Sequence, residues 1–111
     1  MRIGKVIGTV TLSRQHPSIA GATFKLVSPL NWDNLLGKSD QSTEETVVFD
    51  ELGAGLGSRI ALSEGREAAM PFYPEVKPID SYNAAILDTL HCEVGGQAVG
   101  CVATHQDRRL P

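Results

Sequence analysis

Short segments in which apolar residues alternate with polar ones recur along the chain, divided by eleven glycines and six prolines. Alternation with a period of two places every second side chain on one face, as in a strand buried on one side. Several short strands separated by turn residues are typical of a β-sandwich or β-barrel. We therefore expect a mainly β fold, with strands at residues 3–12, 22–30, 43–51, 58–63 and 83–93 and a further short strand at 98–103.

The connections follow from proline, glycine and polar residues. A loop is expected at 15–21 and a long turn at 31–42, where the sequence is mostly polar. Residues 64–70 predict one or two helical turns, which Pro71 stops. Three prolines make 71–78 an extended loop.

The first strand carries glycines on its apolar face. Val6, Val10 and Leu12 share this face with Gly4 and Gly8, and glycine there allows a bend or a close backbone approach. In the next three strands, the same alternation groups Phe24, Leu26 and Leu30, then Val47 and Phe49, then Ile60 and Leu62.

Length and charge narrow the class of protein. A chain of 111 residues has the size of one domain. The formal net charge is −3 and no run of Lys and Arg forms a basic stripe, so we expect no nucleic-acid partner. No apolar run approaches the roughly 20 residues that cross a bilayer, and the N-terminus does not read as a signal peptide. A cytosolic protein with no membrane partner is expected, and its two cysteines, Cys92 and Cys101, are expected to be reduced.

The glycine cluster Gly53, Ala54, Gly55, Leu56 and Gly57 is the most distinctive local feature. A dinucleotide-binding loop would need its third glycine where residue 58 is a serine, followed by a helix, and the sequence that follows here is strand-like. The Gly-Lys-Ser/Thr signature of a phosphate-binding loop is absent from the sequence as well. We interpret the cluster as a tight turn or a close approach between subunits, with no cofactor.

A zinc site could be assembled from His91, Cys92, Cys101 and His105, but their spacing contains no CxxC pair. Alternation also puts His91 and Cys92 on opposite faces of a strand, so core or tail positions explain them better, and no metal is expected.

The sequence supports a catalytic site no better than a zinc site. Glu64, Glu67, Asp80 and Asp88 lie near turns, and two of them could in principle form an acid/base pair. No nucleophile accompanies them, so helix capping or ion pairs between subunits are the simpler explanation. We expect that the protein is not an enzyme and has no catalytic residues.

Taken in order, several segments resemble one family. They are 1–10, with Met1-Arg2-Ile3-Gly4; 16–30, which begins His16-Pro17-Ser18-Ile19-Ala20-Gly21; 47–57, which contains Asp50-Glu51-Leu52-Gly53-Ala54-Gly55-Leu56-Gly57; and 78–88. Together they resemble the bacterial microcompartment vertex proteins, the EutN/CcmL group of carboxysome and ethanolamine-utilisation shell proteins. The resemblance covers most of residues 1–88, and the block 50–57 is its most specific part.

The resemblance implies a five-stranded β-barrel akin to the oligonucleotide-binding (OB) fold, with a short helix and an extended C-terminal tail. It implies a structural protein whose five copies close a ring at a shell vertex, beside hexameric shell proteins, in a microcompartment in the cytoplasm. A head-to-tail contact that is repeated by rotation about one axis closes the copies into a ring. The family pattern places Gly53 to Gly57 at the subunit contact or near the fivefold axis, with Arg66, Glu67 and Asp80 as polar contacts.

Two departures from the family pattern affect the surface more than the barrel. The last strand is extended by residues 89–111, and residues 64–74 are longer than the compact turn of the family. We expect a barrel domain at 1–93 and a C-terminal extension at 94–111.

Two other classes of function stay open at this point. An OB-like barrel could bind a small ligand or nucleic acid, but it would then need a basic or aromatic groove, and Trp32 and Tyr82 are too few and too scattered for a base-stacking platform. A small hydrolase or metal enzyme would use His91, Cys92 and His105, and would carry a stoichiometric metal.

Overall fold

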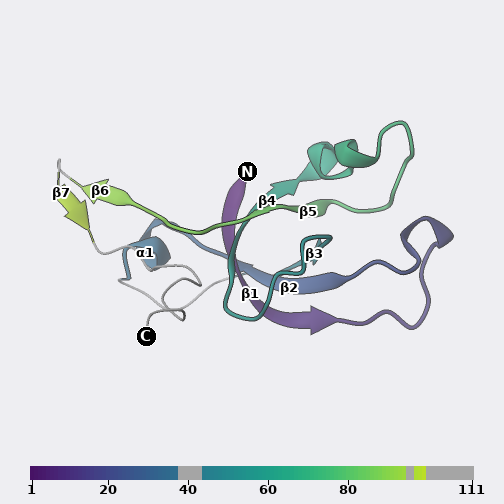
Figure 1. Ribbon diagram of the computed structural model, residues 1–111, viewed down its shortest axis with the longest axis horizontal. Helices are drawn as coiled ribbons and strands as arrows, with labels where there is room; N and C mark the ends of the chain where they lie inside the picture. Colours follow the sequence, from purple (N-terminus) through teal and green to yellow (C-terminus); the bar gives the residue numbers. More distant parts are fainter. Residues whose placement is uncertain (38–43, 95–96, 100–111) are drawn as a thin grey trace.

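The computed structural model describes residues 1–37, 44–94 and 97–99. Five strands close into a barrel in the order β1-β2-β3-β5-β4 (Figure 1), which confirms the mainly β class and the five-stranded barrel. They are β1 (Arg2–Val10), β2 (Phe24–Pro29), β3 (Thr46–Phe49), β4 (Arg59–Glu64) and β5 (Ser81–Ile86).

Shorter elements lie between and after these strands. They are the 3₁₀ helices η1 (Pro17–Ile19) and η2 (Gly65–Phe72), the helix α1 (Trp32–Leu35), and a hairpin of β6 (Cys92–Val94) and β7 (Gln97–Val99). The hairpin forms a two-stranded sheet of its own, at the opposite end of the molecule from η2 (Figure 1). No helix in the described ranges is long and apolar enough to cross a membrane.

Strand β1 pairs antiparallel with both β2 and β4, and it lies opposite the contact of β3 and β5 in the strand order of the barrel. Gly4 pairs with Pro29 on one side and with Ile60 on the other. The closing contact of the barrel is different, because β3 and β5 run parallel and share a single residue pair, Phe49 with Tyr82.

The core is small and aliphatic. Its buried side chains are Val6, Val27, Val48, Ala54, Ile60 and Leu62, with Ile86 packed against them. Gly4 is required by this packing, because a Cβ at this position would lie 2.5 Å from Val27 Cγ1 and 2.8 Å from Leu62 Cδ2. The sequence predicted a bend or a close backbone approach at the glycines of the first strand, whereas the nearest neighbours of Gly4 are two side chains of the core.

The inward faces were predicted correctly for β4 and incorrectly in part for β2 and β3. Ile60 and Leu62 are fully buried, whereas the core residues of the other two strands are Val27 and Val48 instead of Leu26 and Val47. Val47 is 43% exposed. Both strands are apolar at consecutive positions, so the sequence has no polar face that would fix which side is inward.

Three predicted elements need correction. The long turn at 31–42 contains α1, which Asn31 caps: its side chain accepts from the Asn34 amide, and the Asn34 side chain accepts from the Asn31 amide. The predicted strand 83–93 is two strands, since β5 ends at Ile86 and β6 begins at Cys92. The predicted strand at 98–103 is replaced by β7, and its residues 100–103 lie outside the described ranges.

The expected helix at 64–70 is a 3₁₀ helix that ends one residue after Pro71. Cys92 is 7% exposed and disulfide-bonded, where the sequence predicted a reduced thiol. The pairing of Cys92 with Val99 shows that the chain folds back here, which the interpretation of 83–93 as one continuous strand did not include. The other cysteine, Cys101, lies outside the described ranges.

Candidate subunit contact at the glycine turn

The glycine cluster forms an exposed turn between β3 and β4, residues 50–58, which we call the contact turn. Gly53 and Gly57 have φ of 75° and 84°, in the left-handed region that favours glycine. The turn is joined to β1 at its end, where the Gly57 amide donates to the Val6 carbonyl and the Val6 amide donates to the Ser58 carbonyl, both at 2.9 Å. The two glycines thus have a backbone role that other residues would fill only with strain.

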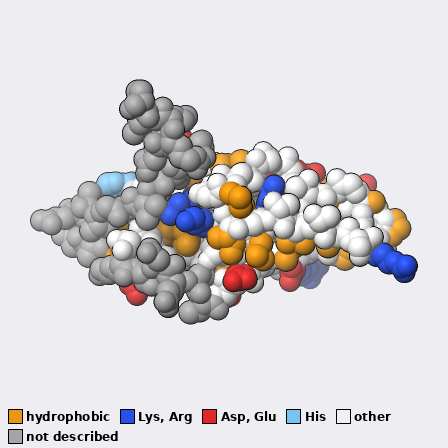
Figure 2. All heavy atoms as spheres, turned by 90° about the horizontal axis from the view of Figure 1, so that it is seen from below, with side chains coloured by type: hydrophobic (Ala, Val, Ile, Leu, Met, Phe, Trp, Pro, Cys, Tyr) orange, Lys and Arg blue, Asp and Glu red, His pale blue; other side chains and the backbone are white. Residues whose placement is uncertain are grey.

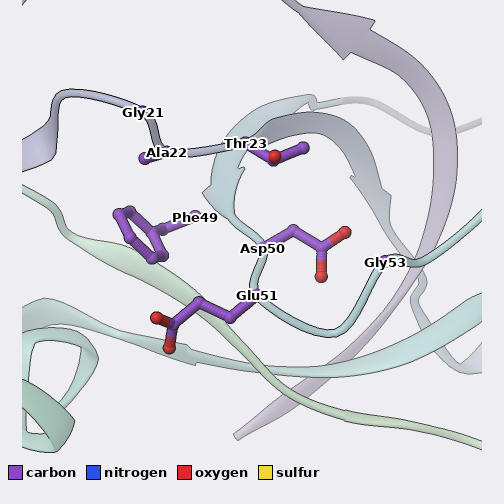
Figure 3. A pocket seen from close by; sticks show the side chains of 7 residues that line it. All are labelled: Gly21, Ala22, Thr23, Phe49, Asp50, Glu51 and Gly53. Atoms are coloured by element: carbon purple, nitrogen blue, oxygen red, sulfur yellow. The ribbon is translucent and has the colours of Figure 1, made fainter.

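A buried carboxylate organises the first half of the contact turn. Asp50 Oδ1 accepts from the Leu52 amide at 3.0 Å and from Asn83 Nδ2 at 2.9 Å, and Oδ2 accepts from the Ala54 amide at 2.8 Å. Figure 3 shows the Asp50 carboxylate directed to the side of the turn where Gly53 lies. Asp50 is 3% exposed, so these bonds replace water around a buried charge.

A hollow of about 270 Å³ lies beside the contact turn (Figure 3). One wall is the segment after η1 and the other is the end of β3 with the start of the turn; the lining residues are Gly21, Ala22, Thr23, Phe49, Asp50, Glu51 and Gly53. The hollow is small and holds no basic side chain, so it does not have the composition of a nucleotide or phosphate site.

Glu51 connects this hollow to β5. Its carboxylate accepts from the Tyr82 hydroxyl at 2.8 Å. Burial raises the pKa of Tyr82, and the hydrogen bond to Glu51 and the negative charges of Glu51 and Asp50 raise it further. Tyr82 is therefore a neutral hydrogen-bond donor that joins β5 to the start of the contact turn.

The contact turn exposes two leucines beside the carboxylate of Glu51. Leu52 and Leu56 are 50% and 68% exposed, while Ala54 between them is buried in the core. A Cβ at Gly55 would meet nothing nearer than Ser58 Oγ at 4.0 Å, so the protomer itself leaves space at this position. Figure 2 shows further hydrophobic side chains along one face of the barrel, with isolated charged groups among them. An exposed turn with apolar side chains on a rigid base is suited to contact with another protein.

The other predicted contact residues lie apart from the contact turn. The turn precedes β4, whereas Arg66 and Glu67 follow it in η2, at the opposite end of the strand. Arg66 and Asp80 line a groove of about 550 Å³ between η2 and the proline-rich loop, and Glu67 lies outside that groove. Two of its lining residues are joined by a hydrogen bond, in which the Gly65 amide donates to the Asp80 carbonyl at 2.9 Å. The predicted residues therefore form two separate groups within the protomer.

No three His, Cys, Asp or Glu side chains gather as a possible metal site in the described part of the chain. His91 is exposed and lies 3.5 Å from Glu93 Oε2, and His105 lies outside the described ranges. Within the described ranges, Glu93 is thus the one possible metal ligand that the structure places near the His91 ring.

Comparison with known proteins decides the family. Residues 1–88 match the family described as "Ethanolamine utilisation protein EutN/carboxysome". The chain belongs to the EutN/CcmL family. This EutN/CcmL chain is 35% identical to the bacterial microcompartment shell vertex protein PduN of Salmonella typhimurium, over 83% of the chain and 100% of PduN. It is 33% identical to the carboxysome shell vertex protein CcmL of a Nostoc species, over 84% of the chain and 88% of that protein.

Solved structures of the family agree with the fold. CcmL of Gloeobacter violaceus superimposes with a TM-score of 0.73 at 30% identity, covering 91% of this chain and 97% of CcmL. The pentameric microcompartment shell protein GrpN of Rhodospirillum rubrum superimposes with a TM-score of 0.70 at 29% identity, covering 84% of this chain and all of GrpN. The EutN/CcmL resemblance found in the sequence is confirmed.

Sequence reasoning missed the residues that hold the contact turn in place. Asp50 precedes the glycines, and an aspartate that accepts from the amide two residues on is a common turn signal. Asn83 is 33 positions away and gives no such local signal.

Proposed function

We propose that this EutN/CcmL protein is a structural shell protein that forms homopentamers and caps the vertices of a bacterial microcompartment. The observation that carries the proposal is the family match over residues 1–88, together with the likeness to pentameric GrpN over all of that chain. A fivefold ring lets a shell of hexagonal tiles close, since hexagons alone form flat sheets. The partners would be four further copies of this chain and hexameric shell proteins of the same compartment.

The contact turn is our choice for one side of the subunit contact. A head-to-tail ring joins two different patches of the same protomer, and the exposed Leu52 and Leu56 give this turn apolar area for one of them. Arg66, Glu67 and Asp80 lie at the other end of β4, which is compatible with polar contacts to a different neighbour. We retain the barrel domain at 1–93 and the extension at 94–111 as part of the proposal.

A structural role without catalysis fits the site. The hollow beside the contact turn is lined by two carboxylates and contains no nucleophile that is paired with a base. The hollow beside the contact turn holds no basic side chain, so it does not favour an OB-like binding module for nucleic acid or an anionic ligand there. The family match favours the structural role over a binding module.

Shell assembly tests the proposed role. Hexameric shell protein from the same compartment is produced with and without this chain, and the particles are imaged by electron microscopy. We expect closed shells only with the chain present and open vertices or sheets without it. Closed shells of the same appearance in both preparations would overturn the vertex role.

A size series at Gly55 tests the position of the contact. Gly55→Ala fits the isolated protomer, because a Cβ here meets only Ser58 Oγ at 4.0 Å, and thermal unfolding checks that Gly55→Trp folds as well. We expect Gly55→Ala to remain pentameric and Gly55→Trp to lose the ring, since the large side chain would occupy the place of the neighbour. A Gly55→Trp variant that keeps the wild-type native mass would exclude Gly55 from the contact.

A further inference from the structure

The barrel is closed between β3 and β5 mainly by side chains. The other neighbouring strands share at least four residue pairs each, whereas β3 and β5 share one. Side chains bridge the remaining distance: Thr46 Oγ1 lies 3.3 Å from Ser81 Oγ, and Asp50 Oδ1 accepts from Asn83 Nδ2 at 2.9 Å. We call this side-chain junction between β3 and β5 the seam. Polar contacts therefore contribute to the seam beside the stacked rings of Phe49 and Tyr82, since backbone pairing contributes little here.

Asp50 takes part in both the seam and the contact turn. One carboxylate oxygen is shared between Asn83 of β5 and the Leu52 amide of the turn, and the other accepts from the Ala54 amide. The Asp50 amide itself donates to the Thr23 carbonyl at 2.8 Å. With Asp50 3% and Asn83 1% exposed, little water is available to replace any of these bonds.

The side chain of Asn83 is itself oriented by the backbone of β5. Its Oδ1 accepts from the Ala85 amide at 3.1 Å, which orients the side chain so that Nδ2 faces Asp50. The position of the carboxylate is thus defined from the barrel side by Asn83, and the carboxylate defines where the amides of Leu52 and Ala54 lie. A rearrangement of the seam at Asn83 would reach the exposed Leu52 through the Asp50 carboxylate.

We infer that Asp50 is a positioning residue that couples closure of the barrel at the seam to the shape of the contact turn, and that Asn83 acts on the turn through it. If the proposed pentamer forms, the consequence is that assembly of the ring depends on a hydrogen bond buried inside each protomer. This consequence rests on the proposed function. The contact turn itself would then be presented in one shape before the subunits meet, which lowers the ordering cost of assembly.

Two variants and a control test the coupling. Asp50→Asn is nearly isosteric but replaces one acceptor oxygen by an amide group, so three N–H donors face a single oxygen. Asn83→Ala removes the seam bond to Asp50 and leaves the sequence of the contact turn unchanged. Gly4→Ala is the control for a general loss of stability, because it strains the core at Val27 and Leu62 and removes no bond of the seam. Ring association is measured by native mass over a dilution series, and folding by thermal unfolding.

We expect both Asp50→Asn and Asn83→Ala to stay folded and to weaken ring association about tenfold or more, the effect of one lost hydrogen bond to a charged group. Gly4→Ala should lower the unfolding temperature and leave the association of its folded fraction unchanged. The coupling is wrong if Asn83→Ala assembles as the wild type does, or if Gly4→Ala weakens the ring equally at equal loss of stability.

Amide hydrogen exchange separates this inference from the proposed pentamer. The Leu52 and Ala54 amides should be protected in the wild type and should lose protection in Asn83→Ala, whether or not the protein forms a ring. If Asp50→Asn does not fold, the Asn83→Ala exchange result decides alone, and unchanged protection of both amides would overturn the inference. A monomeric wild type would instead overturn the pentamer.

Discussion

The ring of Phe49 stacks on the ring of Tyr82 at the point where β3 meets β5, with centroids 6.1 Å apart and planes inclined by 24°. Phe24 and Phe72 meet the same pair edge-on, with centroids 5.2 to 5.7 Å from Phe49 or Tyr82. Aromatic packing therefore supports the closure of the barrel where the backbone contributes one residue pair. The strand that leads to the contact turn and the strand that carries Asn83 meet in this cluster.

Tyr82 should titrate above the ordinary tyrosine pKa of about 10, because burial and the nearby carboxylates disfavour the phenolate. Absorbance titration of Tyr73→Phe, in which Tyr82 is the remaining tyrosine, measures this pKa. Glu51→Gln in the same background should lower it, since the carboxylate charge is removed. An equal pKa in both variants would show that Glu51 has no influence on Tyr82.

The direction of the pH effect on stability follows from the raised pKa. The neutral phenol is favoured in the folded state, so the contribution of Tyr82 is complete below about pH 10 and is lost as the pH rises through the folded pKa. Tyr82→Phe should flatten the fall in the free energy of unfolding between about pH 9 and 11, where the unfolded tyrosine titrates. An equally steep fall in Tyr82→Phe would assign the pH effect to another group.

Gly4 and Gly8 make a matched pair in β1. Gly4→Ala places a methyl group 2.5 Å from Val27 Cγ1, and overpacking of this kind costs about 1–3 kcal/mol. Gly8→Ala meets Leu26 Cβ at 3.5 Å, which is ordinary contact, and should be much less costly. Urea denaturation of the two variants measures the difference, and equal costs would contradict the packing described for Gly4.

Lys77 holds the proline-rich loop against the loop that precedes β2. Its ammonium donates to the Ser18 carbonyl and lies 4.9 Å from the centre of the Phe72 ring. The side chain is 14% exposed. Lys77→Met keeps most of the aliphatic chain and removes the charge, and should cost about 1–2 kcal/mol in the free energy of unfolding.

Lys5→Met is a suitable control for Lys77→Met, because Lys5 is exposed on β1 and its loss should change stability by less than about 0.5 kcal/mol. Urea denaturation is again the measurement. If the two lysine variants lose the same stability, the contacts of Lys77 do not stabilise the loop.

The sequence predicted the barrel and the family well, for identifiable reasons. Gly53 and Gly57 are visible as a cluster because their backbone conformation requires glycine. Strand β4 is visible because Ile60 and Leu62 are two positions apart and share one face. The inward faces of β2 and β3 could not be predicted in the same way. Each strand has two adjacent apolar residues, Leu26 and Val27 in β2 and Val47 and Val48 in β3, and the sequence does not show which of the two is buried.

The remaining errors come from contacts that have no local pattern. Helix α1 is four residues long and depends on the reciprocal bonds of Asn31 and Asn34, which two asparagines in a polar segment do not reveal by themselves. The bond between Asp50 and Asn83 joins residues that only the closure of the barrel brings together. The positions of Arg66, Glu67 and Asp80 between subunits stay a prediction.

Native mass is the most direct test of the central claim, that this chain assembles as a homopentamer. The purified protein is measured by native mass spectrometry and by light scattering over a range of concentrations. Five copies of the 11.9 kDa chain should give about 60 kDa. A mass that stays at 11.9 kDa at every concentration, or one that corresponds to another number of copies, would contradict the account.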